Sequence, residues 1–116
     1  MKDLSENKAP LISHRGVKST HPENTLGAYN DAIKAGFEAI ELDVVMSKNK
    51  TLYCSHNHDL ELETDGFGYI PDLSDAEIDS CLAIHPITGR KEKIPRLEGV
   101  LKKLPNKMYL NIEIKS

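Results

Sequence analysis

The sequence predicts an α/β fold in which parallel strands line the inside of a barrel and helices cover its outside. Segments with the two-residue period of strands alternate with segments of helical period, in the order β-α-β-(hairpin and insert)-α-β. Two of the strands carry charged residues on the face opposite their apolar one: Glu41, Asp43, Glu113 and Lys115. An open doubly wound sheet has helices on both faces and would bury these charges, whereas a barrel points them inward, toward the mouth. The pattern therefore favours a TIM (β/α)8 barrel.

The first strand and the first helix are predicted over residues 10–14 and 26–37. Gly16 ends the strand, and Asn24 or Thr25 can cap the helix. Apolar residues then recur at helical spacing until the helix closes at Gly36: Leu26, Tyr29, Ile33 and Phe37.

The second strand is predicted over residues 39–46. Its apolar residues (Ile40, Leu42 and Val44) face one side, and Glu41 and Asp43 face the other. A turn at residues 49–50 brings the chain back as a paired strand over residues 51–56.

The middle of the chain, residues 59–90, is less regular. Ser74 and Glu77 have the spacing of a capping box, which predicts a short helix ending near Leu82. Residues 85–93 are predicted to be a polar loop.

The last two elements are clearer. Residues 95–104 are predicted to form a helix with its leucines and Val100 on one face. Residues 108–115 are predicted to form a strand in which Leu110, Ile112 and Ile114 alternate with Asn111, Glu113 and Lys115.

Composition narrows the class of protein. The chain has 116 residues and a net charge of −3, which indicates one small domain and argues against a nucleic-acid partner. No apolar run approaches the ~18 residues of a membrane span. Residues 1–8 show no secretory signal, which predicts a cytoplasmic location, or a secreted or periplasmic one if a signal was removed. Cys54 and Cys81 lack zinc or CxxC spacing, and two buried free thiols are favoured over one disulfide.

Glu41 and Asp43 are candidate metal ligands. They lie two residues apart on a predicted strand, so their side chains leave one face roughly 6.6 Å apart. Two such carboxylates repel each other unless a cation or a proton lies between them. Oxygen ligands suit Ca²⁺ or Mg²⁺, and Glu113 would add a third carboxylate. The alternative is a solvated edge strand with ordinary surface acids.

His14 and His56 end two predicted strands, where a barrel places groups for acid–base catalysis. Arg15 follows His14, and its guanidinium offers a fork for a phosphate. Taken singly, each of these residues is also typical of an ordinary surface position.

Five segments of the chain share their order and spacing with one known family. They are His14-Arg15-Gly16 with Pro22-Glu23-Asn24-Thr25, Glu41-Leu42-Asp43-Val44, Tyr53-Cys54-Ser55-His56 with Leu60-Glu61 and Gly66-Phe67-Gly68, Ile94-Pro95-Arg96-Leu97-Glu98, and Asn111-Ile112-Glu113-Ile114-Lys115. The chain thereby resembles the glycerophosphodiester phosphodiesterases from about Leu11 to Lys115.

The resemblance implies a TIM-barrel enzyme that hydrolyses small-molecule glycerophosphodiesters to glycerol 3-phosphate and an alcohol with Ca²⁺ or Mg²⁺. By position, it implies metal ligands at Glu41, Asp43 and Glu113, an acid–base pair at His14 and His56, and phosphate contacts from Arg15 and Lys115. It also implies that residues 62–93 form a small cap-like insert.

The chain departs from the family pattern at two places. The family usually has His-Asp where this chain reads His56-Asn57-His58-Asp59. Aligning His56 keeps the later glycines in register, so His56 is favoured over His58. Leu62 stands where the family commonly has Arg, so the cap and its substrate preference are expected to differ.

Length is the largest departure, since a TIM barrel needs roughly 250 residues. Residues 1–116 are therefore interpreted as the N-terminal part of such a barrel, with three barrel strands and two barrel helices. The remainder of the barrel or another chain is expected to complete it. Two alternatives stay open: a phospholipid phosphodiesterase similar to sphingomyelinase D, and a non-catalytic fragment that binds metal or self-associates through its open edge.

Overall fold

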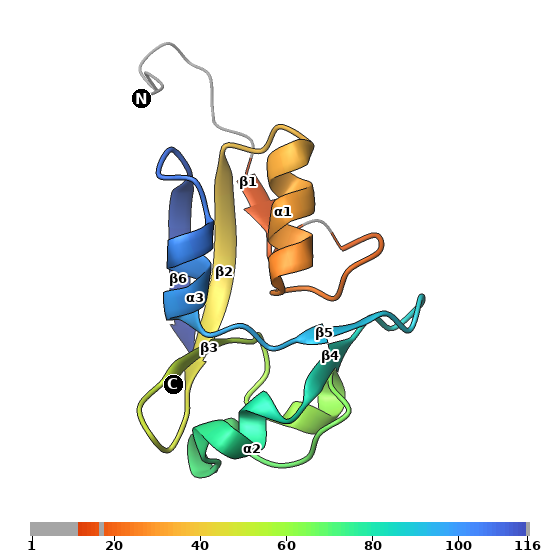
Figure 1. The fold of residues 1–116 in the computed structure, drawn as a ribbon, viewed down its shortest axis with the longest axis vertical. Helices are drawn as coiled ribbons and strands as arrows, with labels where there is room; N and C mark the ends of the chain where they lie inside the picture. Colours follow the sequence, from red (N-terminus) through yellow and green to blue (C-terminus); the bar gives the residue numbers. More distant parts are fainter. Residues whose placement is uncertain (1–11, 17, 116) are drawn as a thin grey trace.

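The computed structural model describes residues 12–16 and 18–115 (Figure 1). The strands are β1 (Ile12–His14), β2 (Ala39–Met46), β3 (Leu52–Cys54), β4 (Leu82–Ile84), β5 (Lys91–Lys93) and β6 (Tyr109–Lys115). The α-helices are α1 (Leu26–Lys34), α2 (Asp75–Asp79) and α3 (Leu97–Lys103). Single turns of 3₁₀ helix lie at Leu60–Leu62 and Ile70–Asp72.

β2 is the central strand of the main sheet. β6 runs parallel to it along one edge, from the Ala39–Tyr109 pair to the Val45–Lys115 pair. The other edge is shared: β1 pairs in parallel with the first half of β2, and β3 pairs antiparallel with its end. The predicted parallel strands and the predicted hairpin are both confirmed.

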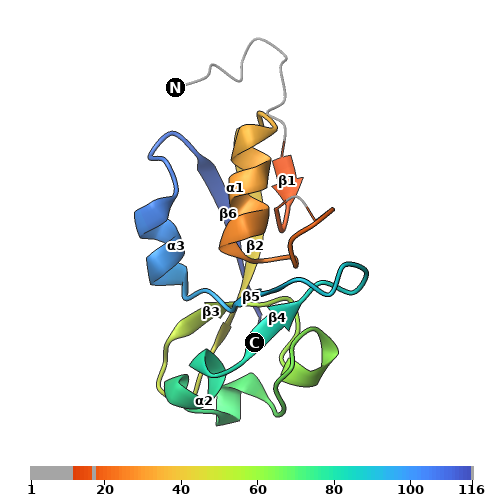
Figure 2. The same cartoon turned by 45° about the vertical axis from the view of Figure 1, so that its right-hand side comes forward.

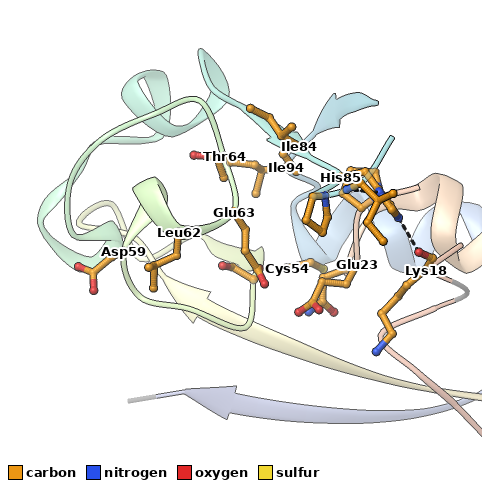
Figure 3. Close-up of a pocket in the computed structure, with 16 residues that line it drawn as sticks. Lys18, Glu23, Cys54, Asp59, Leu62, Glu63, Thr64, Ile84, His85 and Ile94 are labelled. Atoms are coloured by element: carbon orange, nitrogen blue, oxygen red, sulfur yellow. Dashed lines mark hydrogen bonds between the residues drawn. The ribbon is translucent and has the colours of Figure 1, made fainter. Parts of the chain in front are cut away.

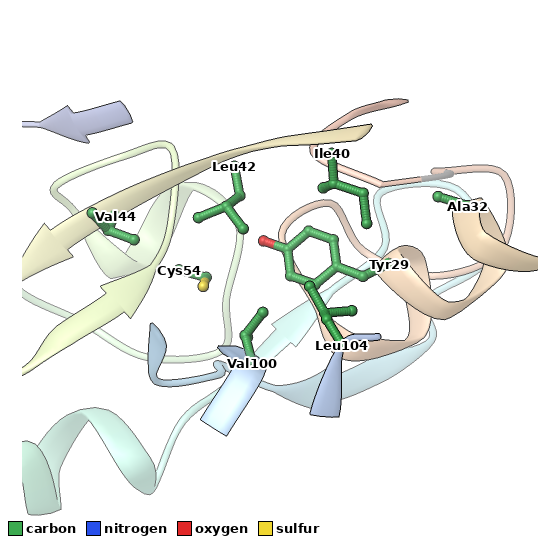
Figure 4. Close-up of a cluster of buried hydrophobic side chains, with 8 residues drawn as sticks. All are labelled: Tyr29, Ala32, Ile40, Leu42, Val44, Cys54, Val100 and Leu104. Carbon is green, nitrogen blue, oxygen red and sulfur yellow. The ribbon is translucent and has the colours of Figure 1, made fainter. Parts of the chain in front are cut away.

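Both long helices cover the same face of this sheet (Figure 2). Tyr29 of α1 and Val100 of α3 meet the apolar side of β2 in one buried cluster. Figure 4 draws its members: Tyr29, Ala32, Ile40, Leu42, Val44, Cys54, Val100 and Leu104. The charged side chains of β2 and β6 lie on the opposite face, as the barrel interpretation requires. The predicted α/β class is confirmed, while closure into eight strands stays a prediction.

A second buried cluster holds together the segment between β3 and α3. It consists of Val45, Tyr53, Leu60, Ile70, Ile78, Ala83 and Ile94. Because Val45 lies near the carboxyl end of β2 and Tyr53 lies on β3, this segment packs at that end of the sheet, in the lower part of Figure 1. The segment includes the predicted insert at residues 62–93, whose role as a cap stays a prediction.

The prediction of a polar loop over residues 85–93 is wrong for its last part. β5 pairs antiparallel with β4, with Leu82 opposite Lys93 and Ile84 opposite Lys91. The Lys91-Glu92-Lys93 sequence shows no apolar alternation because this ribbon has only two strands and leaves both lysines exposed.

Other boundaries differ by a few residues. The predicted capping box of Ser74 and Glu77 is present, but its helix ends at Asp79 rather than near residue 82. The first helix ends at Lys34, and Thr25 rather than Asn24 caps it, through the amide of Ala28. The return strand is shorter than the predicted 51–56, and residues 10–11 of the predicted first strand lie outside the described residues.

Glu92 and His85 of the insert tie it to the first βα unit. Glu92 of β5 accepts a hydrogen bond from the Gly27 amide at 2.6 Å and lies 2.8 Å from His21 Nδ1. His85, which is buried, contacts the Lys18 carbonyl oxygen through Nε2 at 2.7 Å. These contacts join residues more than sixty positions apart, so they fix the insert over the end of the sheet.

The outer side of β6 is open. Within residues 12–16 and 18–115, no strand pairs with its second edge, and Ile114 is 65% exposed. This agrees with the predicted open edge. None of the helices in the described part of the chain is long and apolar enough to cross a membrane.

The two cysteines are both free, as predicted. Cys54 is buried in the first cluster, and burial raises the pKa of its thiol to about 12. Cys81 is half-buried rather than buried, so the prediction holds for only one of the two thiols.

We expect iodoacetamide at about pH 8 to alkylate Cys81 and to spare Cys54 in the folded chain, because the thiolate is the reactive species. Mass mapping of tryptic peptides measures both sites at once. The urea-unfolded chain is the control, in which both residues should react. Equal labelling of the two cysteines in the folded chain would contradict the buried position of Cys54.

Candidate active site

The turn after β1 brings His14 and Arg15 to the carboxyl end of the sheet. Arg15 has a positive φ of 63°, a conformation that costs energy for a residue with a side chain. Its amide donates to the Glu41 carbonyl oxygen at 2.6 Å, which ties the turn to β2. The strained turn therefore delivers both side chains to the neighbourhood of Glu41 and Asp43.

The three predicted carboxylates come together. Asp43 and Glu113 are direct partners in the parallel pairing of β2 and β6, and Glu41 lies one pleat earlier on the same face. Glu41, Asp43 and Glu113 each offer an oxygen within 4.8 Å of the others. Oxygens around one Ca²⁺, bound at 2.3–2.6 Å, are separated by distances of this order.

Carboxylate oxygens that lack hydrogen bonds indicate whether a cation fits this cluster. Glu41 Oε1 and Asp43 Oδ1 are buried and accept no hydrogen bond, although buried carboxylate oxygens normally do. Burial first, and then the charge of Asp43, raise the pKa of the Glu41 carboxyl. A hard divalent cation would satisfy both oxygens and offset the repulsion, so this set of residues fits Ca²⁺ or Mg²⁺.

Cationic side chains surround the carboxylates. Arg15 Nε lies 2.9 Å from Asp43 Oδ2, and Arg15 NH1 donates to Glu23 Oε2 at 3.1 Å. Lys115 Nζ lies 3.7 Å from Asp43 Oδ1 and 3.6 Å from Glu113 Oε1. His14 Nε2 lies 2.7 Å from Glu41 Oε2. Six of the seven predicted site residues are thus linked by these contacts and the carboxylate cluster.

The seventh predicted residue, His56, lies two positions beyond β3 and is half-buried. The amide of Ser55 donates to the Asp43 carbonyl oxygen at 3.0 Å, which holds the preceding residue against the end of β2. His58 differs: its ring stacks on Tyr69 at 5.8 Å, and its Nε2 is buried without a hydrogen bond. The ring contact with Tyr69 gives His58 a place in the packing against the insert, and the choice of His56 over His58 stays a prediction.

A cavity of about 520 Å³ lies beside the site, between the insert and the segment from residue 18 to 24 (Figure 3). Glu23 and Glu63 extend into it from opposite sides, and Leu62 also lines it. Burial and the nearby Glu23 charge raise the pKa of the Glu63 carboxyl, while a hydrogen bond from Asn57 lowers it. The cavity combines a largely apolar wall with acidic groups.

Sequence reasoning missed two residues of the site, Asn24 and Tyr29. The Asn24 carboxamide contacts both the backbone and the side chain of Asp43, and the Tyr29 hydroxyl donates to it. The sequence pattern predicts other roles for both residues, Asn24 as a helix cap and Tyr29 as a core residue. Nothing in their spacing reveals these contacts, which depend on how α1 crosses the sheet.

Comparison with known sequences and structures decides the family. The sequence profile described as the glycerophosphoryl diester phosphodiesterase family matches residues 14–116. The chain belongs to this family. A glycerophosphodiester phosphodiesterase of Caldanaerobacter subterraneus subsp. tengcongensis is 37% identical over 94% of this chain and 46% of its own length. One from Bacillus altitudinis is 33% identical over 91% of this chain and 45% of its own length.

Solved structures of the family agree. The glycerophosphodiester phosphodiesterase of Agrobacterium tumefaciens superposes with a TM-score of 0.87 at 33% identity, over 94% of this chain and 48% of that one. A phosphodiesterase of Oleispira antarctica, in complex with the product sn-glycerol-3-phosphate, superposes with a TM-score of 0.81 at 29% identity, over 96% and 46%. The family resemblance predicted from the motifs is confirmed, and the chain spans less than half the length of these relatives.

We expect Glu113→Gln to weaken binding of Ca²⁺ or Mg²⁺ by about tenfold or more, because fewer charged ligands lower the affinity of a carboxylate site. Isothermal titration calorimetry measures the affinity. Glu113 is exposed, so its replacement should leave the fold intact. The matched control is Glu98→Gln on α3, an exposed acid that pairs with Lys102; this variant should bind metal like the unaltered chain. An equal loss in both variants would argue against the site.

Proposed function

We propose that this chain carries the metal and phosphate sites of a hydrolase that cleaves glycerophosphodiesters to glycerol 3-phosphate and an alcohol. The observation that carries the proposal is the cluster of Glu41, Asp43 and Glu113 with its orphaned buried oxygens, in a chain of this family. The Oleispira antarctica relative, which holds sn-glycerol-3-phosphate as its product, supports the choice of product.

The reaction first requires that the negative charge of the phosphodiester be neutralised. A bound Ca²⁺ or Mg²⁺, held by the three carboxylates, would neutralise phosphate charge that grows in the transition state. Arg15 and Lys115 add cationic groups on the same side of the sheet. Arg15 is oriented by its contacts with Glu23 and Asp43, and its fork keeps further N–H groups for a phosphate oxygen.

His14 and His56 are proposed as the acid–base pair. One takes the proton of the attacking hydroxyl as the new P–O bond forms, and the other gives a proton to the alcohol oxygen as the old P–O bond breaks. The attacking group is either water, which gives glycerol 3-phosphate directly, or the 2-hydroxyl of the glycerol, which gives a cyclic phosphate. In the second case a water molecule must then open the cyclic phosphate to give glycerol 3-phosphate. Support for His14 comes from its 2.7 Å contact with Glu41, which orients the ring at the carboxylate cluster.

The insert at residues 62–93 is proposed to cover the substrate. It forms one wall of the 520 Å³ cavity, and the opposite wall includes Glu23, the partner of Arg15. A substrate phosphate at Arg15 would therefore place one of its substituents in this cavity. Leu62 in place of the family's usual Arg makes the cavity wall less cationic, which supports a different substrate preference.

We also propose a cytoplasmic location.

The test is hydrolysis of glycerophosphocholine. A coupled dehydrogenase assay measures the glycerol 3-phosphate that is released. We expect His14→Ala and His56→Ala each to lower the rate by about 100-fold or more, the usual range for a lost acid or base. His58→Ala is the matched control and should keep most of the activity. Circular dichroism checks that the variants fold. Unchanged rates in both His14→Ala and His56→Ala would overturn the assignment.

A phospholipid phosphodiesterase similar to sphingomyelinase D is the competing enzyme. The same assay with sphingomyelin in vesicles separates the two, since that enzyme would hydrolyse the bilayer lipid and leave the water-soluble diester intact.

The open edge of β6 favours a role for further strands or a second chain in completing the protein. Ile112 and Ile114 are exposed on a strand whose second edge is unpaired within residues 18–115. Such an edge is a template for pairing with another strand.

We therefore expect the isolated chain to sediment as an oligomer, and Ile114→Lys, which places a charge on this edge, to shift it toward the monomer. Ile87→Lys is the control, because Ile87 is 89% exposed at the tip of the β4–β5 hairpin and away from the sheet edge. Sedimentation velocity measures both. A soluble monomer for the unaltered chain would argue against association through β6.

A further inference from the structure

Asn24 is buried between the turn after β1 and the start of α1. Its exposed fraction is 2%, and its φ of 57° lies in the left-handed region that Asn tolerates better than most residues. Its amide donates to the Arg15 carbonyl oxygen at 2.9 Å. It does not cap α1, because Thr25 does so. The side chain of Asn24 is thus left for another role.

The side chain of Asn24 forms two hydrogen bonds with Asp43. Asn24 Nδ2 donates to Asp43 Oδ2 at 3.2 Å, and the Asp43 amide donates to Asn24 Oδ1 at 3.3 Å. The carboxamide of Asn24 therefore forms hydrogen bonds with both the backbone and the carboxylate of Asp43. Asp43 is fully buried, so these are contacts that water does not replace.

The Asp43 amide, which can only donate, and the Tyr29 hydroxyl together fix which way the carboxamide points. Its hydroxyl donates to Asn24 Oδ1 at 2.8 Å, so that oxygen receives two hydrogen bonds and the NH₂ group must face the carboxylate. Burial, first of all, raises the pKa of Tyr29 well above its usual value, so the hydroxyl keeps the proton that it donates. Tyr29 is fully buried in the core cluster under β2.

As a consequence, the two carboxylate oxygens of Asp43 have different partners. Oδ2 receives Asn24 Nδ2 and lies 2.9 Å from Arg15 Nε, so it is occupied by protein groups. Oδ1 accepts no hydrogen bond and faces the side of Lys115 and Glu113. Oδ1 is the oxygen left for a cation.

We propose that Asn24 is a positioning residue, with its carboxamide fixed by Tyr29, that holds Asp43 so that Oδ1 is presented to the divalent cation. The inference rests on the cation site of the proposed function and adds to it two residues that act through Asp43. Groups that orient a metal ligand in this way typically change metal affinity about 10- to 100-fold when they are removed.

The test compares three variants by the Ca²⁺ and Mg²⁺ affinity of the chain, measured by calorimetry. Asn24→Gly removes the carboxamide and keeps the left-handed backbone. Tyr29→Phe removes only the hydroxyl and is the deciding variant if Asn24→Gly fails to fold. Thr25→Ala is the matched control, because it removes the helix cap next to Asn24 and leaves Asp43 untouched.

We expect Asn24→Gly to lower the affinity by about tenfold or more, and Tyr29→Phe to lower it less but measurably. Thr25→Ala should lower the unfolding temperature measured in chelator and leave the affinity unchanged. Where hydrolysis is measured, saturating cation should restore the activity of Asn24→Gly, which a merely structural loss would not allow.

Three results would overturn the inference, and they are distinguishable. Unchanged cation affinity in a folded Asn24→Gly or Tyr29→Phe variant would refute the positioning role and leave the cation site standing. A loss in Thr25→Ala as large as that in Asn24→Gly would attribute the effect to general destabilisation. Absence of cation binding by the unaltered chain would refute the cation site itself, and the positioning role with it.

Discussion

The burial of Asp43 is the constraint on which the rest of the site depends. A carboxylate without access to water is stable only when charges and hydrogen-bond donors replace the lost solvation. Arg15, Asn24 and Lys115 supply them, and they come from the turn after β1, the entry to α1 and the end of β6. One buried charge therefore holds three distant parts of the chain at the same end of the sheet.

The need to compensate the buried charge of Asp43 also explains where the backbone is strained. Arg15 and Asn24 both have positive φ, which ordinary residues adopt at a cost of about 1–3 kcal/mol each. Their backbones are hydrogen-bonded to each other, and both side chains end on Asp43 Oδ2. The strain persists because relaxing either residue would leave the buried carboxylate without its partner.

The two apolar clusters divide the molecule in a way that creates the cavity. The first lies between the sheet and its helices, and the second lies between the end of the sheet and the segment that includes the insert. Cys54 of the first cluster and Ile94 of the second both line the cavity, which lies where the two clusters meet. Glu92 also ties the insert to Gly27 and His21 of the first βα unit. The position of the insert is thus set by polar contacts together with the second apolar cluster.

The sequence by itself determined the order of the main-sheet strands and the two longer helices, the span of β2, the capping box of Ser74 and the family, since each depends on local periodicity or on residues at fixed spacing. It also placed Glu41 and Asp43 on one face, because alternation in a strand is a local rule. Only the tertiary structure decided that Glu113 lies directly beside Asp43, that β5 pairs with β4, and that Asn24 and Tyr29 serve the site. These features depend on strand register and on the path of α1 across the sheet, which arise from contacts between residues far apart in the chain.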